Sequence, residues 1–298
     1  MGRFLKIVFG SCLGSILALI VIFFAFGSFI AGSIGQADQK PTVESNSILS
    51  LDLNSCLQEL TGNKDEQNFN FKLEETPGLH DLIRAIEEAA ADDDIKGIFL
   101  RDQGVSAPLT TLRQVRRAVV KFKESGKFVV AHAPVMTQSA YYLATAADEV
   151  SVGPLGIIDF RGLGAEIPYY KNFLDKSGIN MEVFKVGDYK SAVEPYLRSE
   201  MSEENREQAK AFLEDIFGYM LEDIAESRNV TPAAVRKAAD EMQGWQTEDF
   251  VASGLIDAIL TRSEIDQKMH DLVGLEMDQS LNLISSSDYY SARLNPLG

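Results

Sequence analysis

Cysteine is almost absent from this sequence, since Cys12 and Cys56 are the only two among 298 residues. Cys12 falls in an apolar N-terminal run, so the rest of the chain has one thiol. An intramolecular disulfide is excluded there, as is a metal site built from cysteine pairs. The three histidines, His80, His132 and His270, lack the sequence context of a Ser-His-Asp triad. We therefore expect neither a metal nor a cofactor.

Basic residues are also scarce. The chain has 28 Lys and Arg against 44 Asp and Glu, which gives a formal net charge of −16. Proteins that bind nucleic acid need a basic footprint to neutralise phosphates. Nucleic acid is therefore not an expected partner.

Charge is missing altogether from the segment between Ile7 and Ile34, which is rich in Leu, Ile, Val and Phe. A helix that crosses a bilayer needs about 20 apolar residues, whereas the apolar core of a cleaved signal peptide has roughly 7–15. Arg3 and Lys6 precede the run, so the positive-inside rule places the N-terminus in the cytoplasm and the body in the periplasm or exterior. We expect a single-pass anchor in the inner (cytoplasmic) membrane; the alternative is a long signal peptide cut near Ala37.

After the apolar run, the spacing of apolar residues alternates between the strand and helix periods. Strands are predicted at 47–53, 95–100, 127–132, 149–152 and 181–186. Helices are predicted at 79–90, 109–122, 138–147, 168–177 and 202–227, with further helices beginning at 232, 247 and 263. Parallel neighbours need crossover connections, so this alternation predicts an α/β domain with a mostly parallel sheet covered by helices.

The most informative segment runs Val186-Gly187-Asp188-Tyr189-Lys190-Ser191-Ala192-Val193-Glu194-Pro195-Tyr196. It resembles the signal peptide peptidase A family, whose long, two-repeat members take their general-base lysine from an almost identical segment of the first repeat. The resemblance implies that Lys190 is the catalytic base. It also implies a spiral fold of the crotonase and Clp-protease type, preceded by one transmembrane helix.

A lysine acts as a base only when its amine is neutral near the working pH, so its pKa has to fall. Burial beside apolar groups lowers the pKa of a lysine, whereas a nearby carboxylate raises it. We therefore expect the Lys190 amine to be poorly solvated. We expect the carboxylates of Asp188 and Glu194 to point away from it.

The nucleophile and the oxyanion hole are expected to be incomplete in this chain. Aligning Tyr141-Tyr142 with the serine-bearing helix start of one-repeat relatives puts Gln138 at the nucleophile position. Ser139 follows, but one residue on a helix turns a side chain by about 100°, which makes it a poor substitute. Val105-Ser106, after Gly104, breaks the Gly-Gly pair of complete sites.

The resemblance implies that the serine comes from a second, homologous repeat. We expect a cytoplasmic N-terminus and anchor at 1–37, a peptidase-family domain at 38–276, and a linker at 277–298 to a missing second repeat. The implied function is that of a membrane-anchored serine endopeptidase with a Ser-Lys dyad. Its substrates would be remnant signal peptides, and it would form a homo-oligomer, a tetramer by resemblance.

Two alternatives remain open. A half with Gln138 at the serine position could be a non-catalytic pseudopeptidase that scaffolds an oligomer. A crotonase-like acyl-CoA enzyme would share the fold, but the anchor argues against it because acyl-CoA is cytoplasmic.

Overall fold

The computed structural model describes residues 2, 10, 14–24, 26, 41–51, 53, 78–101, 104–184, 187 and 189–294. The chain divides into two compact units, Met1–Thr42 and Val43–Gly298. Residues 14–24 of the first unit are helical. Much of the predicted anchor lies outside the described residues, and within those that are described no helix has the length and apolarity to cross a membrane.

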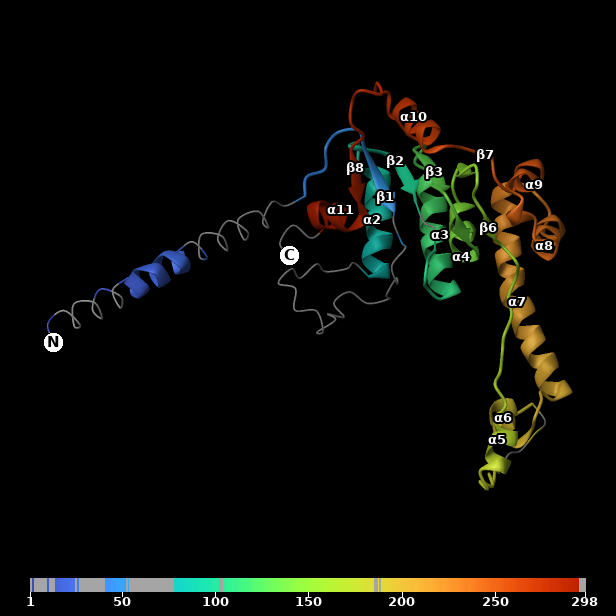
Figure 1. Ribbon diagram of the computed structural model, residues 1–298. Coiled ribbons are helices and arrows are strands. Elements are labelled where there is room, and N and C mark those ends of the chain that lie inside the picture. Colours follow the sequence, from blue (N-terminus) through green and yellow to red (C-terminus); the bar gives the residue numbers. More distant parts are fainter. Residues whose placement is uncertain are drawn as a thin grey trace. The chain divides into compact units, whose positions relative to one another are not determined.

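The second unit is organised around a parallel sheet (Figure 1). Within the described residues its strand order is β7-β5-β3-β2-β1-β8, and every neighbouring pair is parallel. The strands are β1 (Ser47–Leu51), β2 (Ile95–Leu100), β3 (Phe128–Ala133), β5 (Glu149–Val152), β7 (Ala258–Ile259) and β8 (Leu283–Ser285). The predicted mostly parallel α/β sheet is therefore confirmed.

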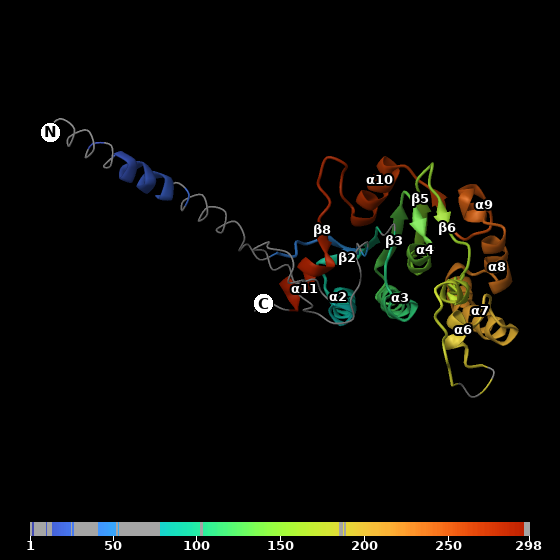
Figure 2. The same ribbon diagram turned by 60° about the horizontal axis from the view of Figure 1, so that its bottom comes forward.

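Helices cover both faces of this sheet, as Figure 2 shows. On one side α2 (Leu79–Ala91) packs against α3 (Leu109–Lys123). On the other side α10 (Arg262–Val273) places Ile265 and Met269 against a smaller apolar cluster of Ile48, Phe99 and Val130. Because both faces are covered, strands such as β1 are buried along their whole length.

A second, two-stranded sheet lies beside the first and leads into α4 (Gln138–Ala144). It pairs β4 (Met136–Thr137) with β6 (Ile158–Asp159). Tyr141 of α4 is fully buried, packs edge-on against Phe160 and Phe250, and donates its hydroxyl to the Leu255 carbonyl at 3.0 Å. These contacts fix α4 against α9 (Thr247–Ala252), which follows α8 (Pro232–Asp240) and the short turn η2 (Gln243–Trp245).

Residues 161–213 leave this sheet domain, and we call them the helical arm. The arm contains α5 (Lys171–Lys176), η1 (Ser191–Val193), α6 (Glu194–Leu197) and the first part of α7 (Glu203–Arg228). Figure 1 shows α5 and α6 at the far end of α7 from the sheet. The apolar residues that α7 buries all lie from Phe217 onward, in its half nearer the sheet.

Two expectations change in the described structure. The strand predicted at 181–186 is wrong for residues 181–184, which are irregular, while 185–186 lie outside the described residues. A strand needs a neighbour to bond with, and no other strand of the described chain lies in the arm.

The expected linker at 277–298 contains β8, which pairs with β1, and α11 (Ser286–Arg293), which packs against α2. The folded domain therefore extends to Arg293.

Candidate active site

The start of α4, where the resemblance places the nucleophile, is hydrogen-bonded to the first residues of the helical arm. Gln138 is half-buried, and its side-chain oxygen accepts hydrogen bonds from the backbone N–H groups of Gly162 (2.9 Å) and Arg161 (3.1 Å). Its side-chain nitrogen donates to the Gly162 carbonyl at 3.1 Å. The amide therefore pairs with the first residues of the arm, and it offers no nucleophile.

The segment beginning at Gly104 lies beside this helix start. A Cβ atom at Gly104 would come within 3.3 Å of the Thr137 methyl group, so the space there suits a residue without a side chain. Val105 is buried and Ser106 is exposed. Asp102 and Gln103 lie outside the described residues. The structure therefore brings the segment at Gly104 and the start of α4 together, as the resemblance implies.

Lys190 lies at the far end of the arm, directly before η1. Its side chain is exposed, and it forms no ion pair with any carboxylate that the structure describes. Figure 1 shows α6, which follows this turn, far from α4. The single chain therefore does not bring Lys190 to Gln138. The amine is exposed in the single chain because the turn stands outside the sheet domain, whose helices could cover it. The poor solvation expected for Lys190 in a complete site, with cover from a second repeat, stays a prediction.

Glu194 is held away from Lys190 by the amino end of α7. Its carboxylate accepts hydrogen bonds from the backbone N–H of Ser202 (3.1 Å), the hydroxyl of Ser202 (2.5 Å) and the side-chain amide of Asn205 (3.2 Å). Burial raises the pKa of Glu194, but these hydrogen bonds outweigh it and leave the pKa below its usual value. The expectation that this carboxylate points elsewhere is confirmed. Asp188 lies outside the described residues.

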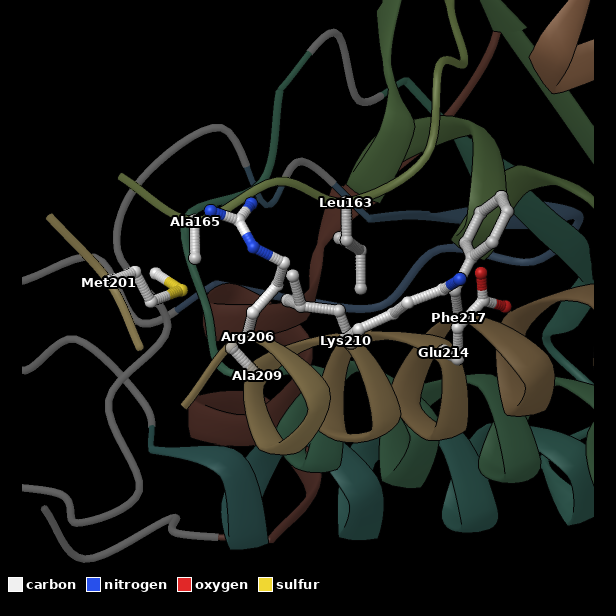
Figure 3. Close-up of a pocket in the computed structure, with 9 residues that line it drawn as sticks. Leu163, Ala165, Met201, Arg206, Ala209, Lys210, Glu214 and Phe217 are labelled. Carbon is white, nitrogen blue, oxygen red and sulfur yellow. The ribbon is translucent and has the colours of Figure 1, made fainter. Parts of the chain in front are cut away.

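A groove runs along the arm between the extended segment after Gly162 and α7 (Figure 3). Its cavity volume is about 270 Å³. The apolar part of its lining is Leu163, Ala165, Met201, Ala209, Leu213 and Phe217, and Arg206, Lys210 and Glu214 complete it from α7. Such a lining suits an apolar chain with a polar backbone. In the described part of the chain, no group of three or more His, Cys, Asp or Glu side chains is arranged to hold a metal ion.

A polar network joins α7 to α3 and α4 in the sheet domain, and no sequence pattern had predicted it. Asp223 of α7 accepts two hydrogen bonds from Arg113 of α3 (2.9 and 3.1 Å) and one from the Tyr142 hydroxyl of α4 (2.5 Å). Arg116 is buried and donates to the carbonyls of Tyr142 and Asp223 and to the hydroxyls of Thr145 and Ser227. Burial lowers the pKa of Arg116. Burial, with the bond to Asp223, raises the pKa of Tyr142.

The fold is thus that of an α/β protein with a parallel main sheet, and the exposed Lys190 lies on its helical arm. Comparison with known proteins agrees: residues 121–276 match peptidase family S49, and the chain belongs to this family. The resemblance to signal peptide peptidase A is confirmed by curated relatives.

Three of these relatives show the extent of the similarity. Protease 4 of Haemophilus influenzae is 33% identical over 294 residues, which are 93% of this chain and 46% of the relative. Protease 4 of Salmonella typhi is 30% identical over 220 residues, 71% of this chain and 36% of the relative. The chloroplastic serine protease SPPA of Arabidopsis thaliana is 27% identical over 221 residues, 74% of this chain and 32% of the relative. The chain therefore spans less than half the length of these relatives.

Solved structures give weaker similarities. The 1510-N membrane-bound stomatin-specific protease aligns with a TM-score of 0.42 at 8% identity, over 81% of this chain and 97% of that one. An enoyl-CoA hydratase/isomerase family member aligns with a TM-score of 0.42 at 13% identity, over 78% of this chain and 72% of that one.

Proposed function

We propose that this chain is the base-bearing half of a serine/lysine endopeptidase, in which Lys190 acts as the general base. The observation that carries the proposal is the segment from Val186 to Tyr196 in a chain that belongs to peptidase family S49. The exposure of Lys190 on the arm supports a partner that meets it from outside this chain.

In the proposed reaction, a serine of a second repeat attacks the carbonyl carbon of the scissile peptide bond. The neutral amine of Lys190 accepts the serine hydroxyl proton as the bond to the carbonyl forms. Collapse of the tetrahedral intermediate breaks the C–N bond, and the protonated lysine returns the proton to the leaving amine. Water then releases the acyl group by the same path. The partner would cover Lys190 and so lower its pKa, because desolvation disfavours the charged amine.

The other features of the proposal follow from the family and from the surface of the arm. We infer that the body faces the periplasm or exterior on a single inner-membrane anchor, residues 1–37, and that a second repeat supplies the serine. The sequential strand order supports a spiral of the crotonase and Clp-protease type. The arm exposes large apolar side chains, including Phe173, Phe184 and Phe212, which supports a homo-oligomer with the arm as its contact surface. The apolar groove supports hydrophobic peptides, such as remnant signal peptides, as substrates.

One observation favours a second candidate function. Because Gln138 is bonded to the arm at the nucleophile position, this half could instead scaffold an oligomer without catalysis.

Hydrolysis of a fluorogenic peptide with an apolar P1 residue separates the two functions. We expect the proposed protein with both repeats, called the full-length protein below, to cleave the peptide. We expect the present chain alone to be inactive, and Lys190→Ala to abolish cleavage in the full-length protein. An inactive full-length protein would favour the scaffold. Turnover by this chain alone that is lost in both Lys190→Ala and Ser139→Ala would show that Ser139 completes the site.

A further inference from the structure

Glu194 and Lys190 belong to one short, rigid piece of backbone. Lys190 directly precedes η1, and Glu194 ends η1 and begins α6. The Glu194 N–H donates to the Ser191 carbonyl, and its own carbonyl accepts from the Arg198 N–H at 2.9 Å. Because only one helical turn separates the two residues, fixing Glu194 also fixes the position and direction of Lys190.

The Glu194 side chain is a fixed point on an otherwise exposed arm. The residue is 2% exposed, whereas Lys190 and Tyr196 on the same turn are exposed. A buried carboxylate is unfavourable unless its oxygens are hydrogen-bonded. Here Ser202 and Asn205 supply three donors. They lie at the amino end of α7, where the helix dipole also favours a negative charge.

Two further hydrogen bonds between the described residues of this turn and α7 lie at the surface. The Tyr189 hydroxyl donates to the Glu207 carboxylate at 3.2 Å, and the Ser191 hydroxyl donates to the Gln208 side chain at 3.5 Å. Both pairs are exposed to water, which competes for the same groups. The bonds of the Glu194 carboxylate are buried and therefore better shielded from water than these two.

From this geometry we propose that Glu194 is the positioning residue for the catalytic lysine. Its carboxylate clamps the Lys190 turn onto the amino end of α7, so that the amine is presented in one direction to a serine outside this chain. Glu194 acts through Lys190 and touches neither substrate nor the reacting atoms. The inference rests on the proposed function, in which Lys190 is the base.

Glu194→Gln tests the clamp with little change in size. An amide has one accepting oxygen, so its NH₂ group would face one of the donors from Ser202 or Asn205, and at least one bond would be lost. In the full-length protein we expect kcat to fall by about 10- to 100-fold, because small misplacements of a catalytic group have effects of this order. KM should change by less than about twofold, since substrate binding is not altered.

Two further variants make the test specific. Glu200→Gln removes an exposed carboxylate from the same connection between α6 and α7 and should leave kcat unchanged. Adding Asn205→Asp to Glu194→Gln restores an acceptor opposite the new amide. We expect this double variant to recover most of the lost kcat, a rescue that general destabilisation would not produce.

Amide hydrogen exchange tests whether the Glu194 carboxylate holds the Lys190 turn, and it does not depend on an activity assay. In the full-length protein without substrate, Glu194→Gln should speed exchange in residues 189–197, and Asn205→Asp should slow it again. Unchanged exchange in Glu194→Gln overturns the inference, and so does faster exchange with an unchanged kcat. If the wild type shows no turnover, or Lys190→Ala retains it, the proposed function fails first and the positioning role fails with it.

Discussion

The sheet domain buries a core of large apolar side chains, whereas the described part of the helical arm buries none. Tyr141 and Phe160 of the sheet domain are fully buried. Phe184 and Phe212 of the arm are 98% and 64% exposed. Polar contacts hold the arm instead, at Glu194 near its far end and at Asp223 in the part of α7 that continues from the arm into the sheet domain. The comparison teaches that the sheet domain is stabilised by its own apolar core, while the described part of the arm has no apolar core of its own.

The largest expected effect is a loss of catalysis without a loss of stability when Lys190 is replaced. In the full-length protein, Lys190→Arg should lower kcat by roughly 10²- to 10⁴-fold, the usual contribution of a general base, because arginine stays charged. The melting temperature should not change, since the side chain is exposed in the arm. Peptide hydrolysis and calorimetry check both expectations. Lys176→Arg, at another exposed position of the arm, is the control; a fully active Lys190→Arg would contradict the base assignment.

The second prediction concerns the junction of the two regions. Asp223→Ala removes the acceptor side chain of Arg113 and of the Tyr142 hydroxyl, and it removes a negative charge near the buried Arg116. Removing one partner of a buried charge pair costs about 3 kcal/mol, and this pair is partly exposed, so we expect a loss of about 2–3 kcal/mol in the free energy of unfolding. Urea denaturation measures it. Glu222→Ala, an exposed neighbour, should change stability by less than about 0.5 kcal/mol.

A third prediction tests whether the exposed apolar residues of the arm serve contacts between chains. Phe184→Ser should alter the free energy of unfolding of the single chain by less than about 0.5 kcal/mol, because the ring touches solvent. If the arm is the contact surface, the same change should weaken self-association by about tenfold, a typical loss for an interface aromatic. Sedimentation equilibrium provides the measurement. Val120→Ser, an exposed apolar residue on α3 of the sheet domain, is the matched control.

The smallest expected effect is a pH dependence confined to the sheet domain. Burial, with the nearby charge of Arg262, lowers the pKa of His132, against a weaker opposing effect of Asp266. The folded protein therefore binds this proton less readily than the unfolded chain does. Stability from the neutral histidine is present above pH 6.5 and declines as the pH falls below it.

His270 should show the opposite sign. Both of its ring nitrogens face backbone carbonyls, of Asp266 and Gln279, which raises its pKa. Its contribution is therefore full below pH 6.5 and declines as the pH rises through the folded-state pKa. Urea denaturation of His132→Gln and His270→Gln between pH 5 and 8 should show opposite changes in the pH slope. Slopes that change in the same direction would contradict one of the two assignments.

The sequence predicted the long, periodic elements and missed the short ones. Strand β2 was predicted with its exact bounds, and α2 and α7 to within one or two residues. The two- and three-residue strands were missed, because alternation cannot be recognised over so few residues. The strand at 181–186 was predicted from a local pattern of apolar residues, and such a pattern does not say whether a pairing partner is nearby.

The candidate site was likewise predicted only in part from the sequence. Lys190 could be proposed because its local segment is distinctive. The need for Glu194 to face away followed from charge alone. Its partners could not be found from the sequence, since Ser202 and Asn205 look like ordinary residues of a helix start. The Asp223 network joins three helices that are far apart in the chain, and no local pattern predicts it.

The hydrogen bonds of Gln138 restrict how such a protein could evolve a nucleophile at this position. Its side chain supplies three hydrogen bonds to the backbone at Arg161 and Gly162, where the arm begins. A serine there would be too short to make them all. A substitution that restored a nucleophile to this half would therefore loosen the attachment of the arm that carries the lysine. The residue at position 138 cannot both bind the backbone of the arm and act as a nucleophile. Evolution of a half that is active alone would therefore first require other hydrogen bonds to residues 161 and 162.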